Sequence, residues 1–194
     1  GITMMPCRLL EENGRAHFMT RRFDRDAAGG KIHMQSLCAL AHYDFNAAGA
    51  YGYEQVLSVM QQLDLGYPEL REIYRRMVFN IFARNQDDHT RNIAFLMDKQ
   101  GKWRLAPAFD VIWAYHPSGR WTNLHQMRIN GKQDEFETAD LLAVANQFKI
   151  KDAEAIIKKT ASAIGRWHEF ASSAGVSEEL INQISSTHRF YLSL

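Results

Sequence analysis

The sequence predicts one mainly α-helical domain that carries a small β-hairpin, and three observations support this prediction. The chain has 194 residues and 46% of them are hydrophobic, which is ordinary for one globular domain with a buried core. From residue 31 onward, apolar residues recur mainly at the spacing of amphipathic helices. Residues 92–106 instead form two extended segments around a turn, as in a hairpin.

The charge balance excludes a surface devoted to nucleic acid. There are 23 Lys and Arg against 22 Asp and Glu, so the net charge is +1. Neutralising several phosphates needs a surplus of basic residues, so direct nucleic-acid binding is not expected and only a local basic patch stays open.

Cysteine usage and hydropathy indicate a protein of the reducing cytoplasm. Cys7 and Cys38 lie far apart and form no C-x-x-C pair, which argues against a zinc knuckle or a disulfide framework. No apolar run approaches the roughly 20 residues that cross a bilayer, and the N-terminus has no signal peptide. We therefore expect a cytoplasmic chain without membrane association.

The first thirty residues contain a predicted hairpin. Cys7–Leu10 and His17–Phe23 have the composition of strands, and the turn-like Glu12–Gly14 lies between them. Asp24–Gly30 then interrupts regular structure.

Two amphipathic helices are predicted next. Pro68 suits the first turn of the second helix, because its missing N–H is not needed there. The apolar stripes are Val56, Val59, Met60 and Leu63 in the first helix and Leu70, Ile73, Tyr74 and Met77 in the second.

The hairpin expected after these helices pairs Asn92–Asp98 with Lys102–Ala106 around the turn Lys99–Gly101. Pro107–Lys132 is rich in Pro, Ser, Gly and Asn, so it is expected to be a long loop.

The C-terminal third is predicted to be helical. Thr138 is the expected cap of one helix, and Ser177 with the two glutamates after it marks the start of another. The apolar faces are Leu141, Val144, Ala145 and Phe148 in the first of these helices and Ile157, Thr160, Ile164, Trp167 and Ala171 in a helix between the two.

The most informative stretch is Arg84–Asn92, where a helix is expected to end and the hairpin to begin. Asp87 and Asn92 match D-x-x-x-x-N, the spacing of the protein-kinase catalytic loop, and Asp110 follows just after the second hairpin strand. Phosphoryl transfer needs a carboxylate that accepts the proton of the attacking hydroxyl, together with oxygen ligands for Mg²⁺. Asp87 fits the first role, and Asn92 and Asp110 fit the second.

The chain resembles the HipA family of bacterial kinases, which are toxins of type II toxin–antitoxin systems. The resemblance is carried by Asn85–Asn92 (NQDDHTRN) and Arg104–Val111 (RLAPAFDV). Thr20–Arg25 resembles the hinge between the lobes of that family, Gln35–Leu40 the following helix, and Trp113–Lys132 the loop after the magnesium-binding segment.

This resemblance implies a kinase-like C-terminal lobe that uses ATP and Mg²⁺ to phosphorylate serine or threonine of a protein. In characterised relatives the target is an aminoacyl-tRNA synthetase, and a DNA-binding antitoxin is an implied partner. By position, Asp87 resembles the catalytic base, His89 a residue beside the triphosphate that joins Asp87 in the catalytic pair, and Asn92 and Asp110 the magnesium ligands.

The same resemblance assigns the nucleotide to the hinge. The backbone around Arg21 and Phe23 is implied to meet adenine, and Asp24 is implied to lie near the ribose.

One half of a complete kinase has no counterpart in the sequence. There is no glycine-rich phosphate loop and no V-A-I-K-type lysine, and Gly49–Gly52 has the wrong spacing. We therefore expect a hinge-region hairpin over residues 1–30, a helical C-lobe over residues 31–194 and no N-terminal lobe, which would be supplied in cis or in trans. The chain is then a fragment of a longer protein or one half of a split enzyme.

Simpler interpretations of the acidic motif stay open. Asp87, Asp88 and His89 could cap a helix end in solvated turn positions, and His89 with the nearby carboxylates could form a hydrolase metal site. The main alternative function is a catalytically incomplete binding module that holds an antitoxin or a target protein.

A second group of residues is expected to be structural. Arg71, Arg75 and Arg76 share one side of a predicted helix, where a solvated face is favoured over a binding surface. The four tryptophans are expected to anchor the core and loops, and the histidines other than His89 to lie at the surface or in hydrogen bonds.

Overall fold

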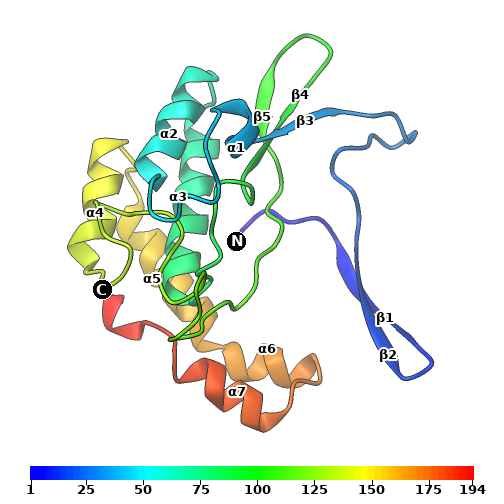
Figure 1. Ribbon diagram of the computed structural model, residues 1–194, viewed down its shortest axis with the longest axis vertical. Helices are drawn as coiled ribbons and strands as arrows, with labels where there is room; N and C mark the ends of the chain where they lie inside the picture. The colour runs from blue at the N-terminus through cyan, green and yellow to red at the C-terminus, as the bar shows by residue number, and fades with distance from the viewer.

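Seven α-helices and five short strands make up the fold, which the computed structural model describes for residues 1–194 (Figure 1). Helices account for 37% of the chain and strands for 17%, so the fold is mixed α/β and the prediction of a mainly α fold was only partly correct. The helices are α1 (Leu37–Leu40), α2 (Tyr53–Gln62), α3 (Tyr67–Phe82), α4 (Thr138–Gln147), α5 (Ala153–Gly165), α6 (Trp167–Ser173) and α7 (Glu178–Ser185), and a short 3-10 helix, Phe190–Leu192, follows them.

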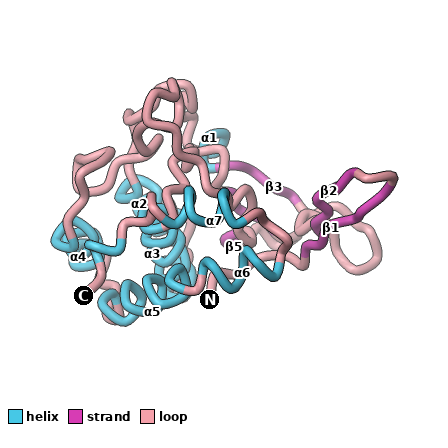
Figure 2. Tube along the Cα trace, turned by 90° about the horizontal axis from the view of Figure 1, so that it is seen from below, coloured by secondary structure: helices cyan, strands magenta, loops and turns pink.

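The first sheet is the predicted N-terminal hairpin. Strands β1 (Cys7–Glu12) and β2 (Arg15–Thr20) pair antiparallel around Asn13 and Gly14. Both turn residues have positive φ, 50° and 73°, as the tight turn of a two-residue hairpin requires. Every residue of both strands is exposed, and the hairpin stands away from the body of the molecule (Figures 1 and 2).

The second sheet contains one strand more than the sequence predicted. Strands β4 (Ala94–Met97) and β5 (Trp103–Leu105) form the expected hairpin, and β3 (His33–Ser36) pairs antiparallel with the free edge of β4. The polar sequence of β3 carries little strand signal, and its partner lies about sixty residues away. This pairing shortens the helix expected over Gln35–Leu40 to α1, which begins after Ser36.

Helix α3 lies at the centre of the hydrophobic core. The predicted stripes of α2 and α3 are largely buried, and α3 packs against α2 on one side and α5 on the other (Figure 1). The hydroxyl of Tyr74 donates to the carbonyl of Leu141 at 3.1 Å and so links α3 to α4. Pro68 lies in the first turn of α3, as predicted.

The C-terminal helices depart from the predicted boundaries in two places. Glu137, not Thr138, caps α4, because the Asp140 carboxylate accepts from the Glu137 N–H at 2.8 Å in a capping box. The helix expected over Ile157–Ala171 breaks at Arg166, which separates α5 from α6. Ser177 caps α7 as predicted.

The segment Pro107–Lys132 contains no helix or strand, as predicted, but backbone hydrogen bonds hold it along its length. Ala108 N–H donates to Thr3 at 2.8 Å, Gln86 N–H donates to Ala114 at 3.0 Å, and Arg128 N–H donates to Tyr51 at 2.8 Å. The segment is therefore part of the framework around the site described below.

None of the helices combines the length and the apolar character needed to cross a bilayer.

Candidate functional site

The loop Arg84–Asn92 begins where α3 ends. Arg84 adopts a left-handed conformation with φ of 57°, which stops the helix and turns the chain. Its guanidinium donates to the Thr187 carbonyl at 3.0 Å and lies over the ring of Tyr115 at 4.3 Å. The start of the loop is thus fixed by contacts with distant parts of the chain.

Asp87 and Asn92 are joined by a hydrogen bond that their spacing makes possible. The side-chain amide nitrogen of Asn92 donates to the Asp87 carbonyl at 3.0 Å, and the Asn92 backbone N–H donates to His89 at 2.9 Å. Because the nitrogen of the Asn92 amide is engaged, its oxygen is the atom left to meet a ligand. The side chain of Asp87 keeps 36% of its surface exposed.

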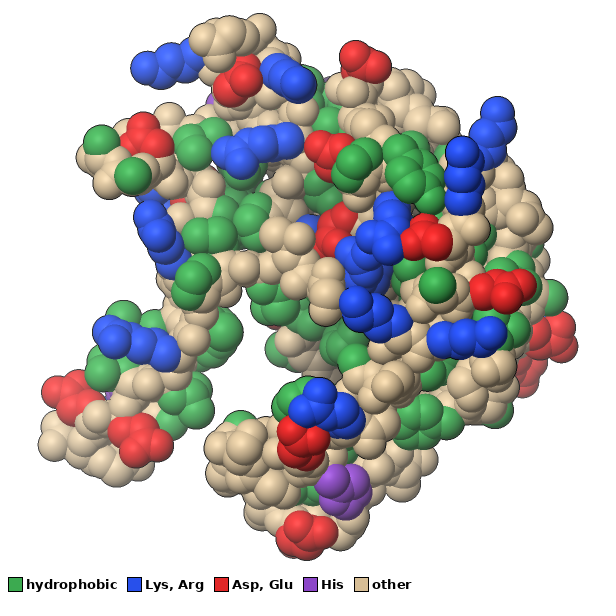
Figure 3. All heavy atoms as spheres, turned by 180° about the vertical axis from the view of Figure 1, so that it is seen from behind, with side chains coloured by type: hydrophobic (Ala, Val, Ile, Leu, Met, Phe, Trp, Pro, Cys, Tyr) green, Lys and Arg blue, Asp and Glu red, His purple; other side chains and the backbone are tan.

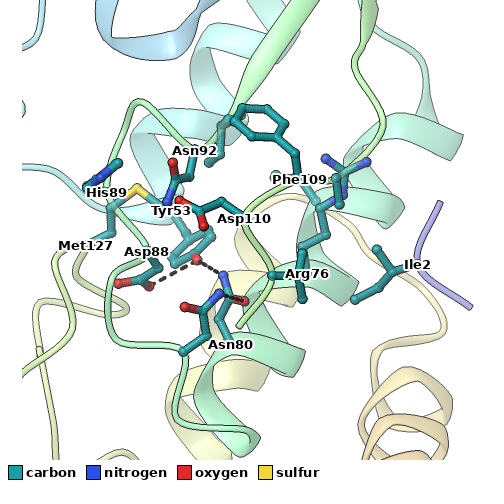
Figure 4. Close-up of a pocket in the computed structure, with 15 residues that line it drawn as sticks. Ile2, Tyr53, Arg76, Asn80, Asp88, His89, Asn92, Phe109, Asp110 and Met127 are labelled. Atoms are coloured by element: carbon teal, nitrogen blue, oxygen red, sulfur yellow. Dashed lines mark hydrogen bonds between the residues drawn. The ribbon is translucent and has the colours of Figure 1, made fainter. Parts of the chain in front are cut away.

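Asp110 reaches the same place from the end of the second sheet. It lines one cavity of about 30 Å³ with His89 and Asn92, and Figure 4 shows its carboxylate beside the Asn92 amide. The Asp110 carboxylate makes no hydrogen bond or ion pair within the chain. Asp110 also has a positive φ of 54°, a conformation that L-residues other than Asn and Asp seldom adopt. The structure therefore brings Asn92 and Asp110 together, whereas Asp87 lies on the loop without lining the cavity.

His89 connects Asp87 with the cavity. Its Nε2 lies 3.9 Å from Oδ1 of Asp87, and its ring packs edge-on against Phe45 with 6.1 Å between centroids. Its Nδ1 is buried and has no hydrogen-bond partner within the chain, so it is a polar atom available to a ligand.

Asp88 is the residue of the motif that sequence reasoning missed. It is 2% exposed, and its carboxylate accepts from the Tyr53 hydroxyl at 3.1 Å (Figure 4) and from the Gln126 N–H at 2.9 Å. Burial, and then the Asp88 carboxylate, raise the pKa of Tyr53 well above its ordinary value, so this hydroxyl stays protonated and donates. The interpretation of Asp88 as a solvated cap was wrong. Two adjacent aspartates carry no signal for which one is buried, and the partners of Asp88 lie more than thirty residues away.

The basic side of α3 is also more buried than expected. Arg76 is 8% exposed and lines the cavity, where it donates to the Ala106 carbonyl at 2.9 Å and to Glu72 at 3.1 Å. Burial lowers the pKa of Arg76, and the Glu72 carboxylate offsets part of this effect. Arg75 donates to the second oxygen of Glu72 at 2.5 Å. The predicted solvated face was therefore wrong for Arg75 and Arg76, and only Arg71, paired with Asp152, keeps substantial exposure.

The residues expected to form the hinge contact the site at one point. Phe23 packs against Phe109, the residue before Asp110, with 5.5 Å between ring centroids. Arg21 is exposed and, like Asp24, does not line the cavity. The structure thus places Phe23 at the edge of the site but does not bring Arg21 or Asp24 into the cavity.

Asp24 is held by its arginine neighbours. Arg22 donates to it at 2.8 and 2.5 Å, and Arg25 donates at 2.7 Å. The hydrogen bond from Arg22 is the main cause that lowers the pKa of Asp24 to about 2, against an opposing effect of burial. The Asp24 carboxylate is therefore ionised at neutral pH.

Comparison with known proteins gives matches at the level of sequence family and of fold. A family model described as the HipA-like C-terminal domain matches residues 1–168. A Haemophilus influenzae protein named "Putative kinase" is 29% identical over 103 residues, which are 49% of this chain and 30% of that protein.

A solved structure shares the fold. It is the complex of the Shewanella oneidensis toxin HipA with HipB and operator DNA, which matches with a TM-score of 0.76 at 13% identity, over 95% of this chain and 50% of the other. At that identity the match establishes the fold alone. The chain spans about half of that solved chain and less than a third of the curated relative.

Proposed function

The chain belongs to the family of HipA-like C-terminal domains, and on that premise we propose that it is the catalytic lobe of a kinase that transfers the γ-phosphate of ATP to a serine or threonine of a protein. One observation carries the proposal: the Asn92 amide closes the loop on the Asp87 carbonyl and lies beside the unpartnered Asp110 carboxylate. The partly exposed Asp87 carboxylate would then act beside two oxygen ligands from Asn92 and Asp110, which is the donor set that phosphoryl transfer requires.

The donor set fits Mg²⁺. Mg²⁺ usually takes one or two carboxylates from the protein and completes its octahedral shell with water and phosphate oxygens. Asp110 offers a carboxylate without a partner, and Asn92 offers an amide oxygen because its nitrogen is already bonded. Mg²⁺ held by these two residues would supply positive charge that offsets the negative charge of the ATP phosphates.

Asp87 would accept the proton of the attacking hydroxyl. The backbone of Asp87 is held by Asn92 while its carboxylate stays accessible, so a substrate hydroxyl can approach without displacing an internal partner. His89, whose buried Nδ1 has no partner within the chain, would donate to a phosphate oxygen.

The adenine would meet the hinge backbone around Arg21 and Phe23. Phe23 and Phe109 are only partly buried and pack on the buried residues Ala94, Leu96 and Ala106, so their rings would offer an apolar surface for the base. Asp24 would lie near the ribose, and Oδ1, which accepts only one of the three arginine hydrogen bonds, keeps a lone pair for a hydroxyl.

The partners follow from the same family relation. We propose that an N-terminal lobe, in cis or in trans, supplies the phosphate clamp, and that the whole protein is the toxin of a toxin–antitoxin pair with a DNA-binding antitoxin. The related solved structure is a complex of HipA with HipB and operator DNA, which supports an antitoxin partner. The substrate would be a protein of the class that relatives phosphorylate, an aminoacyl-tRNA synthetase.

The alternative is a binding module that holds an antitoxin or a target protein without catalysis. It is favoured by the cavity of about 30 Å³, because small-molecule sites usually measure about 300 to 1,000 Å³.

The replacement Asp87→Asn separates the two functions. Supplied with a kinase N-terminal lobe, the wild-type chain should transfer phosphate from ATP to a protein substrate. Asp87→Asn should lower kcat by about 10²- to 10⁴-fold and leave the KM for ATP nearly unchanged, because only the proton acceptor is lost. The measurement is incorporation of the γ-phosphate into the substrate protein under steady-state conditions.

The matched control is Glu154→Gln, which neutralises an exposed carboxylate on α5. It should leave the rate unchanged. A binding module would show no transfer in any variant but would retain its protein partner in Asp87→Asn.

A further inference from the structure

A line of buried polar side chains links the catalytic loop to the C-terminal tail. Asp88 Oδ2 lies 3.0 Å from Nδ1 of His125, and His125 Nε2 lies 2.8 Å from Nη1 of Arg189. The three residues are 2%, 0% and 1% exposed, respectively. They come from positions 88, 125 and 189, so three separate segments meet inside the protein.

The chemistry of Arg189 fixes the state of the imidazole ring. A guanidinium carries donors only, so Nε2 of His125 must accept and cannot hold a proton of its own. The proton therefore sits on Nδ1, where it donates to the Asp88 carboxylate. Phe136 covers the ring edge-on at 5.3 Å, so Asp88 and Arg189 are the charged groups that face it.

Asp88 connects the fixed His125 ring to the loop, because Asp88 lies between the two proposed catalytic residues in the chain. Its carboxylate accepts from His125, Tyr53 and the Gln126 N–H, which together fix its side chain in one orientation. Tyr53 in turn accepts from Asn80 at 2.9 Å. A shift of Asp88 would displace Asp87 and His89, which are its immediate neighbours in the chain.

Arg189 is held firmly in place and lies outside the residues matched by the family model, which end at 168. Its backbone N–H donates to Phe82 at 3.1 Å, its Nη1 donates to Ile81 at 3.1 Å, and its Nη2 pairs with Asp134. Burying a guanidinium is costly unless its donors are satisfied. Here Nη1 and Nη2 donate to Ile81, His125 and Asp134, while Nε has no partner.

We propose that Arg189 and His125 are positioning residues that set the geometry of the catalytic loop through Asp88, so that the C-terminal tail completes the active site. This inference rests on the proposed kinase function for the consequence of the geometry, but the geometry itself can be measured without activity.

The first test is the tautomer of His125 in the whole chain, read from the ¹⁵N chemical shifts of its two ring nitrogens by NMR. The wild-type protein should show a neutral ring with the proton on Nδ1, so the two shifts lie far apart. A ring protonated on Nε2 would overturn the proposal, and this measurement needs no variant to fold.

The second test replaces Arg189 with Met, which is similar in length but has no donor. In Arg189→Met the ¹⁵N shifts of the two His125 ring nitrogens should approach each other. Nε2 is then free to take a proton while Nδ1 keeps its hydrogen bond to Asp88. Backbone amides of residues 85–92 should exchange with solvent about tenfold faster, because the loop loses its anchor. Arg189→Lys keeps a donor and should restore the wild-type tautomer at least in part.

The matched control is Arg166→Met, which removes an exposed arginine paired with Glu169 at the start of α6. It should change neither the tautomer nor the exchange of residues 85–92. If Arg189→Met speeds exchange only near α7 and the tail, Arg189 merely anchors the tail and the proposal is wrong.

Activity separates this proposal from the proposed function. In the reconstituted kinase, Arg189→Met should lower kcat about a hundredfold, the size of effect expected from misplaced catalytic groups, with KM for ATP changed far less. Arg189→Lys should recover much of the lost rate. If the tautomer and exchange results hold while the wild type transfers no phosphate, the structural link from Arg189 through His125 to Asp88 is confirmed and the kinase function is wrong. If Arg189→Met keeps full kcat, the positioning role is wrong.

Discussion

At the scale of single residues, Asp110 combines a proposed role as a Mg²⁺ ligand with a strained backbone. Its φ of 54° lies in the left-handed region, which costs an L-residue about 1 to 2 kcal/mol relative to a right-handed conformation. Asn and Asp tolerate this region best. The identity of residue 110 should therefore affect both the proposed metal site and the free energy of unfolding, and the two effects can be separated.

Asp110→Asn should separate them. Asparagine keeps the shape and tolerates the positive φ, so the free energy of unfolding should change by no more than about 0.5 kcal/mol. Binding of Mg·ATP should be lost, because the only unpartnered carboxylate in the cavity is gone. Calorimetric titration and urea denaturation measure the two effects, and Asp110→Ala should add a loss of about 1 kcal/mol from the strained backbone. Undiminished Mg·ATP binding in Asp110→Asn would show that Asp110 is not a metal ligand.

His188 gives the chain a stability that depends on pH. Its ring packs edge-on against Trp167 and Phe190, and its Nδ1 is buried without a partner. Burial lowers the pKa of His188 below its ordinary value of 6.5. The unfolded state therefore binds a proton more readily, so the stability that His188 contributes is present above pH 6.5 and is lost as the pH falls below it.

The replacement His188→Phe should remove this dependence. The wild-type Tm should fall between pH 7.5 and pH 5.5, and the fall should be smaller in His188→Phe because phenylalanine fills the same apolar site and cannot be protonated. Thermal unfolding at the two pH values measures the difference. The exposed His168, replaced by Phe, is the control, and an equal fall in all three proteins would contradict the prediction.

At the scale of elements, the hairpin β1–β2 differs from the rest of the fold. All twelve of its strand residues are exposed, including Leu9 at 54% and Phe18 at 68%. An isolated two-stranded hairpin is marginally stable in water, whereas the sheet β3–β4–β5 has a buried central strand.

Hydrogen exchange should reveal this contrast. Amides of β1 and β2 should exchange about a hundredfold faster or more than those of β4, because opening the hairpin exposes no buried apolar surface. Mass spectrometry of deuterated peptides covering residues 7–20 and 92–98 measures the ratio. Equal protection of both peptides would show that another surface covers the hairpin in solution.

Local patterns predicted the elements that depend on local forces. Helices α2 and α3 follow from their apolar stripes, and the two hairpins follow from their turn residues. Strand β3 was missed because its only stabilising partner is β4, far along the sequence. The break at Arg166 was missed because the apolar positions of α5 and α6 keep nearly the same spacing across it.

The same division holds for the candidate site. Asp87 and Asn92 are five residues apart, so one spacing rule placed them on a common loop. The burial of Asp88 depends on His125 and Tyr53, and that of Arg76 on Glu72 and the Ala106 carbonyl. Long-range partners of this kind have no local signature in a single sequence.

At the scale of the whole molecule, charge is dispersed and the cavity at the site is small. Seen from behind, basic and acidic side chains are interspersed over the body (Figure 3), in keeping with the net charge of +1. The cavity beside Asp110 holds about 30 Å³, which is too small to enclose a nucleotide.

This shape predicts weak nucleotide binding by the chain alone. Mg·ATP should bind with a Kd near 1 mM or weaker, equivalent to about −4 kcal/mol, because only the proposed hinge and the two proposed metal ligands would contact it. Addition of an N-terminal kinase lobe should tighten binding at least tenfold. Calorimetry with and without that lobe measures the change, and micromolar binding by the isolated chain would show that the site is already complete.

The backbone bonds of Pro107–Lys132 have a consequence for protein engineering. Half of the chain's 106 backbone hydrogen bonds, 53, lie outside its helices and strands, and the long segment after β5 uses such bonds to meet residues 3, 51 and 86. One inserted residue would shift the register of the segment and break several of these hydrogen bonds at once. A peptide tag should therefore be tolerated poorly there. The turn at Asn13–Gly14 makes no backbone hydrogen bond to distant residues. A tag or fluorophore should therefore be inserted at this turn, where extra residues leave the site undisturbed.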